Sequence, residues 1–239
     1  MNKNEFAVLT LLEKENKKMT QREISKILKF SLGKVNAIFN SLVDSGLILD
    51  GVITKKGLKE LEPYRVKRAI FFAAGFGSRL VPITLKTPKP LIKVNGKVML
   101  ENLIESVIDV GIKDIIVVRG HMPEKFDYLK YKYPMIKFMN NPFYNESNHI
   151  SSAYIARNKL SNSYVFESDL VLNNKKLITK YQYSSNVLGF YSKHVNDWCL
   201  NVGSKGVIVN ECFGGNNCYM VLYCSPVFGI GGQRYSLFS

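Results

Sequence analysis

The chain has 239 residues, with 33 Lys and Arg against 19 Asp and Glu, which gives a formal net charge of +14. This length suffices for one large domain or for a medium domain with a small one attached, and the charge favours polyanionic partners such as nucleotides, nucleic acids or acidic surfaces. No apolar run approaches the roughly 20 residues of a membrane helix, and the N-terminus lacks a secretion-signal pattern, so we expect a cytoplasmic protein.

The first 46 residues predict three short helices. Apolar side chains recur at helical spacing over residues 5–16. Thr20 and Glu23 have the spacing of a capping box, which predicts a second helix over residues 21–28. Ser31 can cap a third helix that ends at Gly46.

A β-hairpin is predicted next, because Asp50-Gly51 separates two short β-prone runs at 47–49 and 52–54. Three helices followed by a hairpin is the order of a winged helix-turn-helix. Residues 19–25 and 42–48 resemble the corresponding segments of small bacterial winged-helix regulators. A short helix and connector over 58–66 would then close a domain of residues 1–66.

The resemblance to winged-helix regulators implies a DNA interface. It has two parts, a recognition helix and basic residues after the wing. The candidates are Lys34, Asn36 and Asn40 on the helix, with Lys55 and Lys56 at phosphates. The same residues can equally form the solvated face of a helix, and winged helices also serve as protein-interaction or dimerisation units.

Residues 67–239 predict an α/β domain. An apolar run at 68–74 leads into a glycine-rich turn, and a helix-like stretch at 99–110 precedes a second apolar run at 115–118. A strand, a helix and a strand in succession form a βαβ unit, which implies a Rossmann-like, mostly parallel sheet with its ligand site at the carboxyl ends of the strands. The glycine-rich turn lies at such an end.

Gly75 and Gly77 allow the backbone to turn sharply and to bring its N–H groups against a triphosphate. Arg79 adds a bidentate cation, and Lys89 adds a charge that can follow the negative charge developing at the attacked phosphorus. The segment lacks the third glycine of a dinucleotide fingerprint and the Gly-Lys-Ser/Thr ending of a P-loop, which argues against an NAD enzyme and a P-loop ATPase.

The whole run Ala-Ala-Gly-x-Gly-Ser-Arg-x-x-Pro-x-Thr over 73–84, with Thr-Pro-Lys-Pro-Leu at 87–91, resembles the signature of the nucleoside-triphosphate transferase family. Gly120 and the segments 94–101, 125–129, 140–144, 148–154 and 162–165 further resemble bacterial CTP:phosphocholine cytidylyltransferases. The resemblance implies Mg²⁺-dependent transfer of CMP from CTP to phosphocholine or a similar phospho-alcohol, with pyrophosphate released. It implies catalytic roles for Arg79 and Lys89, and nucleotide contacts from Ala73, Ala74, Gly75, Gly77, Ser78, Arg79, Gly120, Asn148, Ser151 and Ser152.

Two other functions stay open at this point. The chain could be a DNA-binding regulator whose transferase-like domain senses a nucleotide. It could also transfer a nucleotidyl group to a sugar 1-phosphate, since that activity shares the glycine-rich turn. The sequence leaves the oligomeric state open, a homodimer included.

Asp169 follows the β-prone run 164–168 and occupies the position that the family uses to hold Mg²⁺. An Asp at a strand end can also simply cap a helix, and Glu167 is the poorer candidate for the metal. The resemblance places Asn148, Ser151 and Ser152 in a polar loop before a helix, where capping would also explain the serines.

Trp198 stands where the family also has an aromatic residue, and with Tyr191 it could cradle a quaternary ammonium group. The alternative for each aromatic is packing in the core. The four cysteines Cys199, Cys212, Cys218 and Cys224 lack zinc-site spacing, so we expect reduced structural thiols.

The resemblance stops after residue 219. The family continues with a second acidic metal ligand, whereas this chain has no Asp or Glu after Glu211. We therefore expect a transferase domain that is incomplete at its C-terminus, in a truncated or frame-disrupted form of a longer protein.

Overall fold

The computed structural model describes residues 1–146, 149–225 and 236–238, with side chains except at 149, 190, 197, 198, 205, 220–225 and 236–238. The chain divides into two compact units, Met1–Arg65 and Val66–Ser239, and each is described by itself. No helix in the described part is long and apolar enough to cross a membrane.

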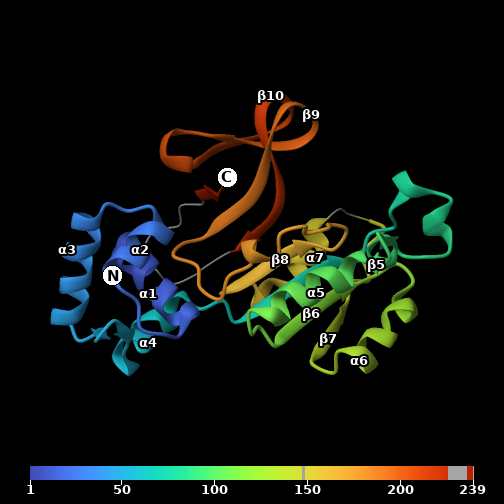
Figure 1. Ribbon diagram of the computed structural model, residues 1–239. Coiled ribbons are helices and arrows are strands. Elements are labelled where there is room, and N and C mark those ends of the chain that lie inside the picture. The colour runs from blue at the N-terminus through green and yellow to red at the C-terminus, as the bar shows by residue number, and fades with distance from the viewer. Residues whose placement is uncertain (147–148, 226–235, 239) are drawn as a thin grey trace. The chain divides into compact units, whose positions relative to one another are not determined.

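The first unit is a helical module with a small hairpin (Figure 1). Its elements are α1 (Lys3–Glu15), α2 (Gln21–Leu28), α3 (Leu32–Asp44), β1 (Ile48–Leu49), β2 (Val52–Ile53) and α4 (Lys55–Leu61). The capping box at Thr20 and Glu23 is present as predicted, and the Ser31 hydroxyl accepts a hydrogen bond from the backbone N–H of Lys34. At the tip of the hairpin Asp50 and Gly51 both have positive φ, 50° and 78°, as a tight two-residue turn between antiparallel strands requires.

The core of this unit is formed by side chains from all four helices and the hairpin. They are Val8, Leu9, Leu12, Ile24, Val35, Leu42, Ile48 and Leu61, each at most 2 % exposed. The apolar spacing predicts these buried faces only in part, because Ile27 and Val43, which it also places inside, are 51 % and 39 % exposed.

The second unit is built on a seven-stranded mixed sheet in the order β11-β9-β10-β8-β3-β6-β7. Its strands are β3 (Arg68–Ala73), β6 (Asp114–Arg119), β7 (Ile136–Asn140), β8 (Ser163–Glu167), β9 (Asn186–Val202), β10 (Ile208–Ser225) and β11 (Ser236–Phe238). The four neighbours β8, β3, β6 and β7 are parallel, which confirms the predicted parallel sheet.

Helices cover both faces of this parallel part. The core on one face joins side chains of β3, β6 and β8 to α5 (Met99–Asp109) and α6 (Tyr128–Lys132). The core on the other face joins Ile70, Ile116 and Val118 to α7 (His149–Ala156). A two-stranded hairpin of β4 (Lys93–Val94) and β5 (Lys97–Val98) precedes α5.

Strands β9 and β10 form a long antiparallel hairpin that joins the sheet through β8 (Figure 1). Their pairing shifts register at several points. Gly214 and Asn217 both have positive φ within β10, which bends this strand. This hairpin is an element that the sequence pattern does not predict.

Candidate functional site

Three parallel strands end side by side at one edge of the sheet. The backbone N–H of His121, just after β6, donates to the carbonyl of Ala74, just after β3, at 3.0 Å. The N–H of Ser168, just after β8, donates to the carbonyl of Phe72 at 3.3 Å. The segments that follow β3, β6 and β8 therefore converge, as expected for a ligand site at the carboxyl edge.

The glycine-rich turn, which comprises Ala74 to Arg79, follows β3 at this edge. Ala73 and Ala74 are buried, whereas Gly75, Ser78 and Arg79 are exposed. A side chain at Gly75 would meet no atom within 4 Å. The backbone of the turn is thus open for the approach of a ligand.

Gly77 has φ of 73° and lies against two later residues of the signature. A Cβ there would come within 3.0 Å of the Thr84 methyl group and 3.1 Å of the Lys89 Cβ. The fully buried Thr84 donates its hydroxyl to the Gly77 carbonyl at 3.0 Å. Glycine at this position lets Thr84 and Lys89 pack against the turn.

Lys89 and Asp169 form an ion pair between their Nζ and Oδ2 atoms. Lys89 opens a short 3₁₀ segment after the turn, and Asp169 lies two residues beyond the end of β8. Both side chains are partly exposed, at 32 % and 24 %. The structure therefore brings into contact the lysine predicted to bind phosphate and the carboxylate predicted to bind the metal. Glu167 is exposed at the end of β8.

Gly120 is surrounded by protein atoms. A Cβ on this residue would lie 2.5 Å from the Tyr144 Cβ and 3.0 Å from the Ala74 Cβ. The next residue, His121, sets its ring edge-on to Phe76 of the turn, with 4.6 Å between the ring centroids. The geometry gives Gly120 a packing role between the turn and Tyr144.

Ser151 and Ser152 do not lie in a loop, as the sequence suggested, but inside α7. Both are buried, and their hydroxyl oxygens accept hydrogen bonds from Asn141 Nδ2 at 2.9 and 3.2 Å. Asn141 Oδ1 in turn accepts from the N–H of Phe143 at 3.0 Å. Buried hydroxyl groups need partners, and Asn141 supplies them. Asn148 lies outside the described residues.

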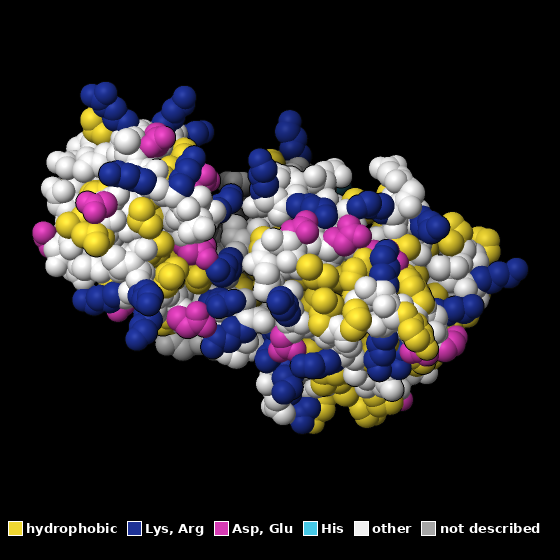
Figure 2. Space-filling view, turned by 60° about the horizontal axis from the view of Figure 1, so that its bottom comes forward, with side chains coloured by type: hydrophobic (Ala, Val, Ile, Leu, Met, Phe, Trp, Pro, Cys, Tyr) yellow, Lys and Arg dark blue, Asp and Glu magenta, His cyan; other side chains and the backbone are white. Residues whose placement is uncertain are grey.

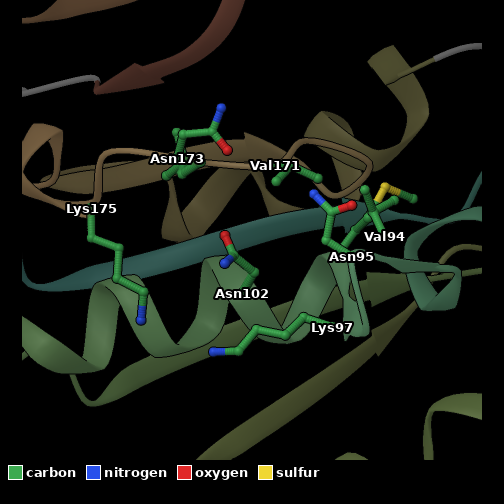
Figure 3. A pocket seen from close by; sticks show the side chains of 9 residues that line it. Val94, Asn95, Lys97, Asn102, Val171, Asn173 and Lys175 are labelled. Carbon is green, nitrogen blue, oxygen red and sulfur yellow. The ribbon is translucent and has the colours of Figure 1, made fainter.

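A cavity of about 300 Å³ opens between the β4–β5 hairpin, α5 and the segment after Asp169. Figure 3 shows Asn95, Asn102 and Asn173 around it. The Oδ1 atom of Asn102 is buried and has no hydrogen-bond partner in the part of the chain that the structure describes. None of the lining residues is acidic, so the cavity suits a neutral or anionic polar group better than an ammonium group.

This geometry agrees with the comparison to known proteins. Residues 68–205 match the nucleotidyl transferase family. The chain belongs to this family. Residues 1–48 match a winged helix-turn-helix DNA-binding family, so the resemblance of both units to known families is confirmed.

Several proteins similar to this chain are cytidylyltransferases. The chain is 37 % identical over 173 residues to 2-aminoethylphosphonate cytidylyltransferase of Lancefieldella rimae, which covers 71 % of this chain and 70 % of that protein. It is 38 % identical over 136 residues to choline-phosphate cytidylyltransferase of Streptococcus pneumoniae, covering 57 % of this chain and 59 % of the relative, less than two thirds of its length. The solved structure of CTP:phosphocholine cytidylyltransferase from the same species superimposes with a TM-score of 0.63 at 33 % identity, covering 68 % of this chain and 71 % of that one.

The nucleotidyl transferase site offers a divalent cation few protein ligands. No group of three or more His, Cys, Asp or Glu side chains in the described residues is arranged to hold a metal. Asp169 offers a carboxylate at this edge, and it already faces the Lys89 ammonium. One carboxylate is sufficient for Mg²⁺, which takes its other ligands from phosphates and water.

The two aromatic residues predicted for choline both belong to β9. Tyr191 is half exposed, donates its hydroxyl to Asn217 Oδ1 at 2.6 Å and packs edge-on against Tyr219. The side chain of Trp198 lies outside the described residues, so an aromatic cage of the two stays a prediction.

The predicted DNA-contacting residues of the first unit are exposed, but they differ in what they contact. Asn36 and Asn40 lie on α3, and Lys34 sets its ammonium 3.9 Å from the centroid of the Phe30 ring. Lys55 and Lys56 lie in the first turn of α4. Lys56 donates to the carbonyl at the C-terminal end of α3, that of Ser45, at 2.8 Å, so this lysine stabilises the helix end as well.

Positive charge is not confined to one patch. On the face shown in Figure 2, Lys and Arg side chains are spread over much of the surface with acidic side chains among them. Charge alone therefore does not mark a binding surface on this face.

For three residues at the carboxyl edge of the sheet the sequence pattern predicts no function. Thr84 and Asn141 stand inside motifs that mark the resemblance, and both are buried and hydrogen-bonded to site segments. His121 carries a buried Nε2 atom that has no hydrogen-bond partner within the described part of the chain. A polar residue that stands in a family motif but has no evident ligand role can therefore indicate a side chain that holds a site segment in place.

Proposed function

We propose that this chain transfers CMP from CTP to a small phosphorus-containing acceptor, phosphocholine in the first place, and releases pyrophosphate. The observation that carries this proposal is the convergence of the open glycine-rich turn, Lys89 and Asp169 at one sheet edge, in a chain that belongs to the nucleotidyl transferase family. The relatives named for 2-aminoethylphosphonate and choline phosphate support an acceptor that carries an ammonium group and a phosphorus oxyanion.

In the proposed reaction an oxygen of the acceptor attacks the α-phosphorus of CTP. The bond between the α-phosphorus and its bridging oxygen breaks, and pyrophosphate leaves. Phosphate and phosphonate oxygens are anionic at neutral pH, so the protein needs no base, and its contribution is positioning and charge stabilisation. The predicted nucleotide contacts from Ala73 to Arg79 would come from backbone N–H groups and the Arg79 guanidinium.

Lys89 and Asp169 have complementary roles in this proposal. The Lys89 ammonium would shift toward the triphosphate, since two or more phosphate charges attract it more strongly than one carboxylate. Asp169 would then be available to Mg²⁺, which when bound neutralises phosphate charge and orients the α-phosphate.

Pyrophosphate release tests the proposal. The full chain would be mixed with Mg²⁺, CTP and one acceptor at a time: phosphocholine, 2-aminoethylphosphonate or a sugar 1-phosphate. We expect turnover with the first or second acceptor, and a loss of about 100-fold or more in Lys89→Ala, as for other removed charge-stabilising groups. Lys113→Ala is the matched control, because Lys113 is an exposed lysine at the opposite edge of the sheet, before β6. Equal turnover of both variants, or turnover only with the sugar, would reject the proposal.

A second proposed function is binding of duplex DNA by the first unit. The match to winged helix-turn-helix DNA-binding proteins and the exposed Asn36 and Asn40 on α3 support it. Asparagine amides can form bidentate hydrogen bonds to adenine in the major groove.

DNA affinity measured against salt concentration tests this second function. Each phosphate contact that a lysine makes contributes about 0.9 to the slope of log K against log salt. The variant Lys55→Ala should therefore flatten that slope by about 0.9, whereas Lys14→Ala on α1 should leave it unchanged. Binding that both variants preserve, or that survives removal of residues 1–66, would assign DNA contact elsewhere.

A further inference from the structure

Three cysteine thiols converge on one point of the β9–β10 hairpin. Cys199 on β9 and Cys212 on β10 stand directly opposite each other, and their Sγ atoms are 3.5 Å apart. The bend in β10 brings Cys218 to the same place. A Cβ at Gly215 would lie 3.4, 3.6 and 3.7 Å from the sulfurs of Cys218, Cys199 and Cys212, so the missing side chain leaves room among the three thiols.

The three thiols differ in their access to solvent. Cys199 and Cys218 are each 1 % exposed and pack with Val195, whereas Cys212 is only partly buried. A hydrogen bond with Cys218, together with burial and the nearby Cys212, raises the pKa of the Cys199 thiol to about 12. The Cys212 sulfur also accepts a hydrogen bond from Asn201 Nδ2 at 3.5 Å. A small reagent therefore reaches Cys212 first, with the protonated Cys199 thiol beside it.

We propose that Cys212 and Cys199 are a site of reversible oxidative modification by hydroperoxides. The Cys212 sulfur attacks the peroxide O–O bond, which yields a sulfenic acid on Cys212 and releases water from hydrogen peroxide. The Cys199 sulfur then attacks the sulfenic sulfur, the S–S bond forms, and the sulfenic hydroxyl leaves as water with the Cys199 proton. Two thiols lose two electrons in total, and the peroxide accepts them.

The strand geometry permits this disulfide. Directly opposed residues of antiparallel strands have Cα atoms about 4.5–5.5 Å apart, which lies within the range that disulfides span. Side-chain rotation has to shorten the sulfur separation from 3.5 Å to about 2.05 Å. A thiol at this distance intercepts a sulfenic acid before a second peroxide can oxidise it further.

Peptide mapping of the peroxide-treated full chain tests the site. Chains carrying Cys224→Ser, which removes the fourth cysteine, would be exposed to hydrogen peroxide, alkylated and digested. We expect a cross-linked peptide pair containing Cys199 and Cys212, lighter by two hydrogens than the sum of the free peptides, and its disappearance after dithiothreitol. The oxidised chain should also melt at a higher temperature, because the bond constrains the unfolded chain.

Single substitutions provide the controls. Cys218→Ser should retain the cross-link, and Cys212→Ser should abolish it. Unchanged circular dichroism and melting of each reduced variant would show that it is folded. Sulfinic acid on Cys212 without a cross-link, a predominant link between Cys199 and Cys218, or thiols that stay unmodified in the folded chain would each overturn the proposal, and the last would leave the three cysteines as core packing.

Discussion

Substitution of Gly120 by alanine tests whether this glycine serves packing at the carboxyl edge. The added Cβ would lie 2.5 Å from the Tyr144 Cβ, 2.7 Å from its Cγ and 3.0 Å from the Ala74 Cβ. Cβ atoms essentially never approach other heavy atoms within 3.0 Å, so backbone or Tyr144 must shift. Overpacking of this kind costs about 1–3 kcal/mol. For a unit of this size each kcal/mol lowers the melting temperature by about 2–4 °C.

The measurement is unfolding by urea or heat, followed by circular dichroism, for Gly120→Ala and for Gly75→Ala. The second variant is the matched control, because a Cβ at Gly75 meets no atom within 4 Å. We expect it to change the free energy of unfolding by less than about 0.5 kcal/mol.

Repeating Gly120→Ala in two Tyr144 variants shows whether the loss of stability comes from the steric clash with Tyr144. The Tyr144→Ala background keeps the Cβ that lies 2.5 Å away, and Tyr144→Gly removes it. Gly120→Ala should therefore destabilise the chain clearly less in the Tyr144→Gly background. Equal effects in both backgrounds, or a Gly120→Ala chain as stable as the original, would refute the packing role.

Three further outcomes are expected. Asn141→Ala removes the two hydrogen bonds that the Asn141 amide donates to buried hydroxyl groups of α7, and it should destabilise the chain by about 1–3 kcal/mol in urea unfolding. Thr84→Val keeps the side-chain shape but removes the hydrogen bond to the glycine-rich turn. Its effect should appear mainly as a lower rate of pyrophosphate release, and only to a small extent as a lower melting temperature. Burial alone would raise the pKa of Asp114, but hydrogen bonds from Lys137 and Arg68 outweigh burial and lower it. The stabilisation from Asp114 is thus present above its unfolded pKa and lost as pH falls through the folded one, so Asp114→Asn should destabilise at neutral pH and much less in acid.

The sequence by itself determined those features that depend on neighbouring residues. The Thr20–Glu23 capping box and the Asp50-Gly51 turn involve groups at most three positions apart, so their patterns are visible in the chain. The parallel sheet likewise follows from alternating strand and helix patterns. The glycine-rich turn is visible as Gly-x-Gly after an apolar run, whereas the expected metal role of Asp169 comes from the family resemblance.

Tertiary structure alone decided which distant side chains meet. Lys89 and Asp169 are 80 positions apart and pair only because the turn after β3, against which Lys89 packs, and the end of β8 lie at one edge of the sheet. Asn141 contacts Ser151 and Ser152 because the segments packed together bury all three, and burial obliges their polar groups to find partners within the protein. The convergence of the cysteines depends in the same way on strand register and on the bend in β10, neither of which periodicity encodes.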